Sequence, residues 1–323
     1  MALNPHFDDN ELVWRDEFSG RYQPPPESYY SQFDDKWRLV LEDDTGAEGF
    51  NAGLGVKMDD SSIRRLVYEW TGEFPSPLRE GKAHVRRAIT ENVPEELIRD
   101  KKCLDAGCGM GRWTRVMQMI GAREVLSVDV SEHSLESVRR FNDNVLSADL
   151  TQLTTQHSEL VGQFDFANLW GVAHHTHDPR ETFRNVAAAV KPGGSMYVML
   201  YDTAGAHNTS LVNGYRRTFA NLNTAEERLE FATAIAERRW HKNIPLKENV
   251  KNFGRKLLRR GTSKKIGILD QLMPFYNWTV PIEVATNWMT QVGFESVQVL
   301  NPDNHGQSSR HYLATNKRVP KGS

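Results

Sequence analysis

The chain has 323 residues, of which 39% are hydrophobic and 25% charged, and its formal net charge is −2. These proportions are typical of a soluble globular protein, and the length allows one large domain or two modest ones. No apolar run reaches membrane length, and acidic residues from Asp8 to Glu11 stand where a signal peptide would be apolar. The only cysteines, Cys103 and Cys108, predict neither a disulfide framework nor a zinc site, which favours a reducing, cytoplasmic setting.

Charge is distributed unevenly along the chain. Residues 1–98 hold 20 acidic and 11 basic residues, whereas residues 238–265 hold 11 basic residues and a single acidic one, Glu248. The basic segment has three interpretations: a site for an anionic substrate, a contact surface for nucleic acid, or a solvated face that balances the acidic N-terminal region. We prefer the third and favour nucleic acid least, because aromatic residues suited to base stacking are few there.

The first 98 residues carry no motif. Residues 1–60 have weak periodicity and are expected to form an extended, aromatic-rich arm that lies on another surface. Helical patterns follow at about 61–70, 76–89 and 94–99. This part of the chain is expected to cover a site that lies elsewhere.

From residue 101 to 202, short apolar segments alternate with helical patterns. Strands are expected at 102–106, 124–130, 144–149, 164–170 and 195–201. Helices are expected at 111–120, from a cap at Ser131, and at 179–190, with a break at 191–194. Apolar strands that alternate with helices predict a parallel, doubly wound sheet.

Residues 203–275 interrupt this alternation with a helical insert. Helices are expected at 224–240 and 247–260, and in the second of these we expect Val250, Phe253, Leu257 and Leu258 to face inward. A further helix to Val292 and strands at 295–300 and 310–316 then complete a seven-stranded sheet. The insert leaves and re-enters the sheet beside the expected site, so we expect it to act as a lid.

Three glycines follow the first strand of this region at a spacing of two. Gly107, Gly109 and Gly111 stand between that strand and a helix, where glycine lets the backbone pass close to a ligand with positive φ. The helix N-terminus beyond them favours an anionic or electron-rich group. A nicotinamide dinucleotide site is the main alternative, but its G-x-G-x-x-G pattern places the third glycine one residue later.

With these features, the chain resembles the class I S-adenosylmethionine-dependent methyltransferases. The resemblance covers about 100–202 and 281–317. It rests on six elements in the correct order: the glycine stretch 104–111, Asp129, Asp149, Val172–Thr176, Val190–Gly194, and Gly293 with Phe294. It implies an α/β fold with a doubly wound, mostly parallel seven-stranded sheet and helices on both faces, plus a helical N-terminal extension and a helical lid insert.

The resemblance implies S-adenosyl-L-methionine as the cofactor. Asp129 would accept both ribose hydroxyls, and Asp149 would accept the adenine amino group, with the Leu150 N–H available to a ring nitrogen. Asp105 would orient the loop or the cofactor amine, and Arg112 either binds the cofactor carboxylate or is a surface arginine. The expected cofactor residues are Asp105, Gly107, Gly109, Gly111, Arg112, Asp129, Val130, Asp149, Leu150 and Trp170.

Candidate catalytic residues follow the fourth and fifth strands. An imidazole titrates near neutral pH, so His174 or His175 is a candidate base, while the other histidine fixes the loop. Tyr201, at the end of the fifth strand, either binds substrate or is a rim aromatic. No metal is expected, because no nearby cysteine or paired carboxylate completes a site with the histidines.

The preferred hypothesis is a methyltransferase that acts on an oxygen or nitrogen of a small-molecule, anionic or sugar-like acceptor. An RNA or protein methyltransferase that docks through the basic insert is the first alternative, and a non-catalytic S-adenosylmethionine-binding module is the second. Neither nucleic acid nor a membrane is the expected partner, and the chain is expected to be a monomer or homodimer. The expected organisation is 1–98 as a covering arm, 99–202 with 276–323 as the core, and 203–275 as the lid.

Overall fold

The computed structural model describes residues 14–15, 32–34, 93–202, 210–257, 265–302 and 309–318. The helices expected at 61–70 and 76–89 lie outside these residues. The helix expected at 94–99 is a single 3₁₀ turn, η1 (Glu95–Leu97), and the backbone reaches a positive φ of 60° soon afterwards at Asp100. Within the described chain, no helix is both long and apolar enough to cross a membrane.

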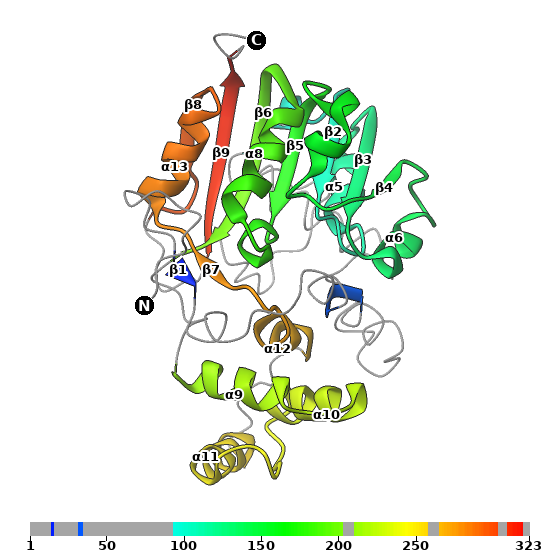
Figure 1. The fold of residues 1–323 in the computed structure, drawn as a ribbon. Coiled ribbons are helices and arrows are strands. Elements are labelled where there is room, and N and C mark those ends of the chain that lie inside the picture. Colours follow the sequence, from blue (N-terminus) through cyan, green and yellow to red (C-terminus); the bar gives the residue numbers. More distant parts are fainter. Residues whose placement is uncertain are drawn as a thin grey trace, which may run out of the picture.

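A mixed sheet of seven strands organises the core (Figure 1). Its order is β4-β3-β2-β5-β6-β9-β8. The first five of these strands run parallel, and β9 runs antiparallel to both β6 and β8. The strands are β2 (Lys102–Ala106), β3 (Glu124–Asp129), β4 (Val145–Ser147), β5 (Phe164–Trp170), β6 (Val190–Tyr201), β8 (Phe294–Val299) and β9 (Ser309–Lys317). The expected mostly parallel, seven-stranded sheet is therefore confirmed.

Helices cover both faces of this sheet (Figure 1). They include α5 (Arg112–Ile120), α6 (Glu132–Val138), α8 (Pro179–Ala189) and α13 (Ile282–Gln291). Alternate strand residues enter different cores: Leu104 and Leu169 pack in the core that includes α8 and α13, whereas Cys103 and Phe166 pack in the core that includes α5. Burial on both faces explains why these strands read as nearly continuous apolar runs.

Two details of the core compare directly with the sequence predictions. Ser131 caps α6 as expected, since its hydroxyl accepts a hydrogen bond from the Ser134 N–H at 3.3 Å. The helix ends before the expected break at 191–194, but these residues already belong to an irregular part of β6. The pairing with β5 jumps from Val190 to Ser195 there, and Gly193 takes a φ of +77°. The extra residues loop out of the ladder without ending the strand.

The insert forms a helical layer with its own core. It contains α9 (Ser210–Ala220), α10 (Ala225–Ala236), α11 (Leu246–Leu257) and α12 (Lys265–Leu272). The sequence analysis missed α9 and α12, each of which includes a glycine that weakens the helical pattern. Phe219, Phe231 and Leu269 join three of these helices in one hydrophobic cluster. In Figure 1, this layer lies below the sheet, beyond the carboxyl ends of the parallel strands.

The position of Val250 on α11 differs from the prediction, and the side chains of Phe253, Leu257 and Leu258 lie outside the described part of the structure. Val250, expected to face inward, is 58% exposed, whereas Asn249 is buried. The reason is hydrogen bonding: the Asn249 side chain donates to the carbonyls of His241 and Ile244, each at 2.9 Å, and accepts from the His241 N–H at 3.1 Å. These bonds to the preceding turn decide which face of the helix turns inward.

Candidate functional site

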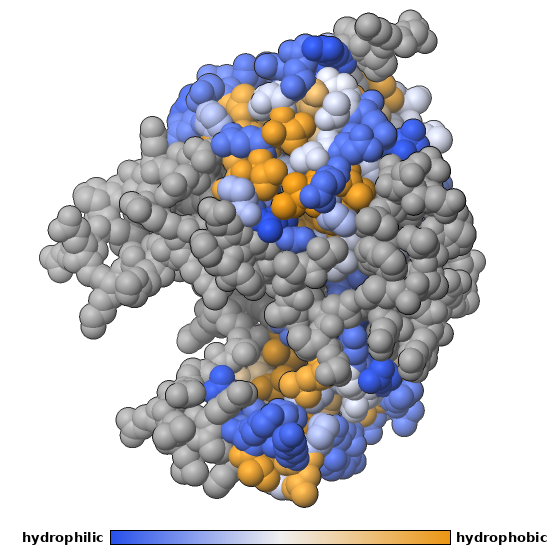
Figure 2. All heavy atoms as spheres, turned by 90° about the vertical axis from the view of Figure 1, so that its left-hand side faces the viewer, coloured by the Kyte–Doolittle hydropathy of each residue, from blue (hydrophilic) through white to orange (hydrophobic). Residues whose placement is uncertain are grey.

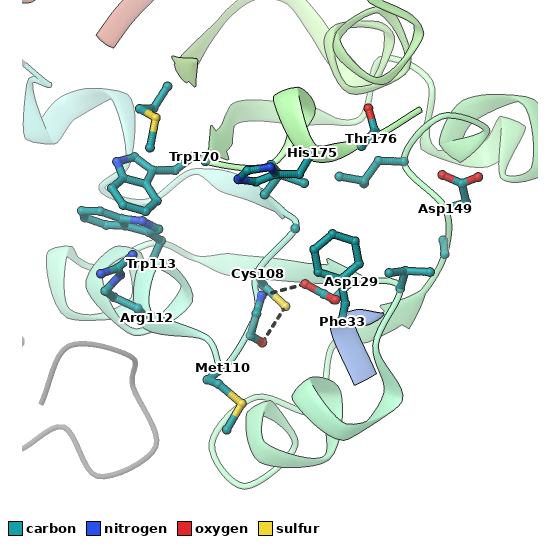
Figure 3. Close-up of a pocket in the computed structure, with 18 of the residues that line it drawn as sticks. Phe33, Cys108, Met110, Arg112, Trp113, Asp129, Asp149, Trp170, His175 and Thr176 are labelled. Atoms are coloured by element: carbon teal, nitrogen blue, oxygen red, sulfur yellow. Dashed lines mark hydrogen bonds between the residues drawn. The ribbon is translucent and has the colours of Figure 1, made fainter. Parts of the chain in front are cut away.

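An open pocket lies at the carboxyl ends of the parallel strands (Figure 3). Its volume is about 1150 Å³, including its solvent-filled mouth. The expected site residues that line it are Gly107, Gly109, Arg112, Asp129, Val130, Asp149, Leu150, Trp170, His175 and Tyr201. The expected residues that are not part of its lining are Asp105, Gly111 and His174. The tertiary structure therefore gathers most of the expected residues around one space.

The glycine loop packs tightly against its surroundings. Gly107 has a φ of +74°, and a Cβ atom at that position would lie 2.3 Å from the Val172 side chain. Gly111 has a φ of +83°, and its Cβ would lie 2.5 Å from the Phe141 ring. Both glycines are therefore required by packing as well as by backbone conformation. Gly109, with a φ of +51°, also lines the pocket.

Asp129 ends β3 and connects the glycine loop to the start of α6. One carboxylate oxygen accepts the Gly109 N–H at 2.8 Å, and the other accepts the Ser131 N–H at 2.9 Å. These bonds fix the carboxylate at the wall of the pocket, where its residue is 8% exposed. A carboxylate can accept roughly four hydrogen bonds, so such a group suits recognition of neighbouring hydroxyls.

Asp149 is held in a similar way after β4. Its two carboxylate oxygens accept from the N–H and the hydroxyl of Thr151, at 2.9 and 2.7 Å. Leu150 and Val130 add apolar surface to the same lining. This part of the pocket combines fixed acceptors with apolar surface, the chemistry that a nucleoside needs.

A residue from the N-terminal arm also lines the pocket. Phe33 belongs to a helical turn at 32–34, and its ring appears beside the site in Figure 3. Its neighbours attach this turn at both sides: Gln32 accepts the Phe275 N–H at 2.7 Å, and Asp34 accepts the Ser131 hydroxyl at 2.5 Å. The sequence analysis missed Phe33, because the arm has no motif or strong periodicity to mark it.

Arg112 lies at another wall with two tryptophans. Its guanidinium carbon is 4.5 Å from the ring centre of Trp170 and 5.2 Å from that of Trp113. The two indole rings are 5.5 Å apart. This arrangement keeps the guanidinium at the pocket through cation–π contacts rather than extended into solvent.

Asp105 lies behind the loop. It is fully buried, and it accepts the Thr114 hydroxyl at 2.7 Å and the Asn168 side-chain amide at 2.8 Å. Burial raises the pKa of its carboxyl to about 6. These contacts join β2 to α5 and β5, which is a scaffold position rather than a position in the pocket lining.

The two candidate histidines have different surroundings. His174 is fully buried and stacks on Tyr201, with ring centres 3.8 Å apart, whereas His175 lines the pocket. His175 Nδ1 lies 3.0 Å from the carbonyl oxygen of Tyr276. A carbonyl only accepts, so this bond assigns the proton to Nδ1 and leaves the lone pair of the neutral ring on Nε2. Of the two, His175 has the position and tautomer of a base.

The segment that returns from the insert to the sheet contacts several parts of the site. Pro274 accepts a hydrogen bond from the buried Arg216 of α9 at 2.5 Å, and the Trp278 indole donates to the Thr176 carbonyl at 2.9 Å. Trp278 also belongs to β7 (Trp278–Thr279), which pairs with β1 (Trp14–Arg15) of the N-terminal arm. The part of the chain that the structure covers contains no group of three or more potential metal-ligating side chains.

Comparison with known proteins identifies a recognised domain. A family model described as "Methyltransferase domain" matches residues 79–242. A tRNA U34 carboxymethyltransferase of Actinobacillus succinogenes is 30% identical over 118 residues, which are 36% of this chain and 37% of that protein. A ubiquinone biosynthesis O-methyltransferase of Stutzerimonas stutzeri is 35% identical over 144 residues, 42% and 60% of the respective chains. The match spans less than two thirds of either relative.

Solved structures give similarities of lower sequence identity. An S-adenosylmethionine-dependent methyltransferase from Mesorhizobium loti is 18% identical with a TM-score of 0.41, over 69% of this chain and 93% of that one. The Burkholderia thailandensis 1,6-didemethyltoxoflavin-N1-methyltransferase, solved with S-adenosylhomocysteine, is 13% identical with a TM-score of 0.44, over 98% of this chain and 100% of that one.

Proposed function

This chain belongs to the methyltransferase-domain family of S-adenosylmethionine-dependent enzymes, and from that membership we propose that it methylates an oxygen or nitrogen of a small-molecule acceptor. The observation that carries the proposal is the shared pocket: fixed acids at Asp129 and Asp149 lie in one lining with His175. The two acids suit the cofactor, and the imidazole suits removal of a proton from an acceptor.

The residues present fit S-adenosylmethionine. The fixed carboxylates of Asp129 and Asp149 suit ribose hydroxyls and the adenine amino group, and Arg112 suits the carboxylate of the methionine part. Gly107 and Gly109 line the same pocket without a side chain, so backbone amides border it directly. When bound, the cofactor supplies a methyl group that its sulfonium already activates.

The chain's own residues supply the remaining chemistry. His175 would accept the acceptor's proton on Nε2 while the Tyr276 carbonyl holds the opposite ring nitrogen in place. Phe33, Met199 and Tyr201 present aromatic and apolar surface in the same lining, which excludes water from the reacting atoms. His174 would act as a positioning residue by stacking on Tyr201.

The place of Lys247 and Lys251 supports a small acceptor over RNA. Lys247 and Lys251 lie on α11, and α11 lies beyond α9 on the side away from the sheet (Figure 1). These cations are therefore remote from the pocket at the sheet edge. Their position gives no support to RNA docking at the active site.

Transfer of a labelled methyl group tests the acceptor class. The protein would be incubated with methyl-labelled S-adenosylmethionine and a cell extract that has been separated into small-molecule, RNA and protein fractions. We expect label in the small-molecule fraction, and its loss in the His175→Ala variant. Nuclease-sensitive or protease-sensitive label would assign the RNA or protein alternative, and binding without turnover in any fraction would assign the binding module.

Calorimetry with S-adenosylhomocysteine tests the cofactor site separately. Asp129→Ala is expected to lower the affinity at least about a hundredfold, since charge-assisted hydrogen bonds contribute about 1.5–3 kcal/mol each. Asp143→Ala is the matched control, because Asp143 is an exposed acid outside the pocket lining. Equal affinity in both variants would remove Asp129 from the site.

A further inference from the structure

The outer face of α11 is apolar. Leu246 and Val250 are four residues apart, so they lie one above the other on the same side of the helix, and they are 67% and 58% exposed. Trp240, in the turn before the helix, is 63% exposed. These are three of the six large hydrophobic residues that are exposed in the described chain, and all three lie between residues 240 and 250 of the sequence.

This orientation is imposed by hydrogen bonds. Rotating α11 to bury Val250 would remove Asn249 from its buried position, where it makes hydrogen bonds to the carbonyls of His241 and Ile244. The neighbouring Asn252 is buried on the same side. In the described part of α11, from Leu246 to Asn252, the protein therefore keeps two asparagines inside and two aliphatic side chains outside.

Positive charge lies beside the apolar row. Lys247 and Lys251 are exposed, and each follows one member of the row in sequence. Lys242 is exposed in the preceding turn. Glu248 is the one acid among residues 238–265, and it pairs with Lys251 at 2.7 Å. Figure 2 shows hydrophobic atoms directly next to hydrophilic ones at the lower end of the molecule, where the insert lies.

We propose that the α11 surface, defined by Trp240, Leu246, Val250, Lys247 and Lys251, binds an anionic lipid bilayer. The apolar residues would enter the boundary between headgroups and acyl chains, and the two lysines would contact the headgroups. Such a helix lies in the plane of the bilayer, so it needs no membrane-spanning length. The expectation of no membrane partner rested on the lack of such a span.

Other partners match these side chains less well. A second copy docked symmetrically on this face would bring the same lysines together, which costs binding energy through like-charge repulsion. Nucleic acid supplies phosphates for the lysines but no apolar layer for Leu246 and Val250. An anionic bilayer complements the charge and the apolar row together.

Vesicle flotation of the full chain tests the proposal. We expect binding to vesicles of phosphatidylcholine mixed with phosphatidylglycerol, little binding to pure phosphatidylcholine, and a decrease with added salt. Leu246→Ser with Val250→Ser is expected to lower the partition coefficient at least about tenfold, because two side chains lose their apolar burial. Val161→Ser is the matched control, since Val161 is 50% exposed in the core domain.

Lys247→Gln with Lys251→Gln gives a second, independent variant. It should weaken binding to the anionic vesicles about thirtyfold, since each of the two lysines near the surface contributes about 1 kcal/mol. Circular dichroism and S-adenosylhomocysteine calorimetry would confirm that each variant is folded. Absence of vesicle binding, equal binding to both vesicle types, or an equal loss in the Val161 control would overturn the proposal. So would a concentration-dependent dimer that the double serine variant abolishes.

Discussion

The Asp34 carboxylate accepts a hydrogen bond from the Ser131 hydroxyl at 2.5 Å, across 97 residues of sequence. Ser131 is the cap of α6, and its own N–H donates to Asp129. This single contact therefore links the N-terminal arm to the acid at the end of β3. With the Gln32 contact to Phe275, it holds Phe33 at the pocket between two parts of the protein that are remote in sequence.

We predict that loss of this contact weakens cofactor binding. Asp34→Ala should lower the affinity for S-adenosylhomocysteine several-fold, because the turn that carries Phe33 then loses its hydrogen bond to Ser131. Ser131→Ala should lower it too, and should also cost about 1 kcal/mol of folding stability through loss of the helix cap. The double variant should be no weaker in binding than Ser131→Ala. Fully additive losses in a calorimetric double-mutant cycle would show that the two residues act independently.

Gly107→Ala should damage both stability and the pocket. Its positive φ costs an alanine about 1–2 kcal/mol, and the clash with Val172 adds about 1–3 kcal/mol of overpacking. Gly162→Ala is a matched control, because Gly162 has a φ of +66° but has nothing within 4 Å of the added carbon. In urea denaturation, Gly107→Ala should therefore lose more unfolding free energy than Gly162→Ala, and the difference measures the clash apart from the backbone strain.

The Gly107→Ala and Gly162→Ala variants also test the rigidity of the pocket. We expect Gly162→Ala to bind S-adenosylhomocysteine normally, and Val172→Ala to restore part of the stability of Gly107→Ala. Similar unfolding free energies for the two alanine variants would mean that the loop moves away from Val172 without cost.

His175→Gln should lower kcat by about a hundredfold or more, since a general base contributes about 10²–10⁴-fold. The wild-type rate should rise with pH as imidazole loses its proton, and the variant should lose this dependence. Cofactor affinity should stay within a few-fold of wild type. His174→Gln serves as the comparison: it should affect stability, because His174 is fully buried, but should keep the pH dependence. If turnover is unchanged in both variants, Tyr201 is the next candidate.

Acid should destabilise the protein through His311. Burial lowers the pKa of His311 from 6.5 to about 3, and its Nδ1 lies 2.7 Å from the Tyr197 hydroxyl. The unfolded chain therefore binds a proton at higher pH than the folded chain does. The stabilisation is complete above pH 6.5 and is lost as the pH falls towards 3.

The comparison with His311→Gln isolates this effect. The unfolding free energy of wild type relative to the variant should fall by about 2–4 kcal/mol between pH 7 and pH 3. Asp105 acts in the opposite direction, because burial raises the pKa of its carboxyl to about 6, but it titrates in both proteins and cancels in the difference. A difference that is constant with pH would mean that His311 titrates normally in the folded state.

The sequence predicted the core of the fold. Most of the residues that it indicated for the cofactor line one pocket. Strand and helix periodicity is local, so the alternation from residue 101 to 202 could be read directly. The parallel strands then brought Asp129 and Asp149 to one sheet edge, and both line the pocket. Their roles towards the cofactor, and the division of the chain into arm, core and lid, remain predictions.

Tertiary structure alone decided three other features: the entry of Phe33 into the pocket, the place of His175 rather than His174 in the pocket lining, and the exposure of Val250 on α11. Each depends on contacts that local periodicity does not encode. Gln32 bonds to Phe275 across 243 residues, and His175 bonds to Tyr276 across 101. On α11, the hydrophobic pattern wrongly predicted that Val250 is buried, because the hydrogen bonds of Asn249 outweigh the burial of one valine. A sequence pattern reflects the average preference of each residue type for burial. Whether one particular side chain is buried depends on the specific polar contacts around it.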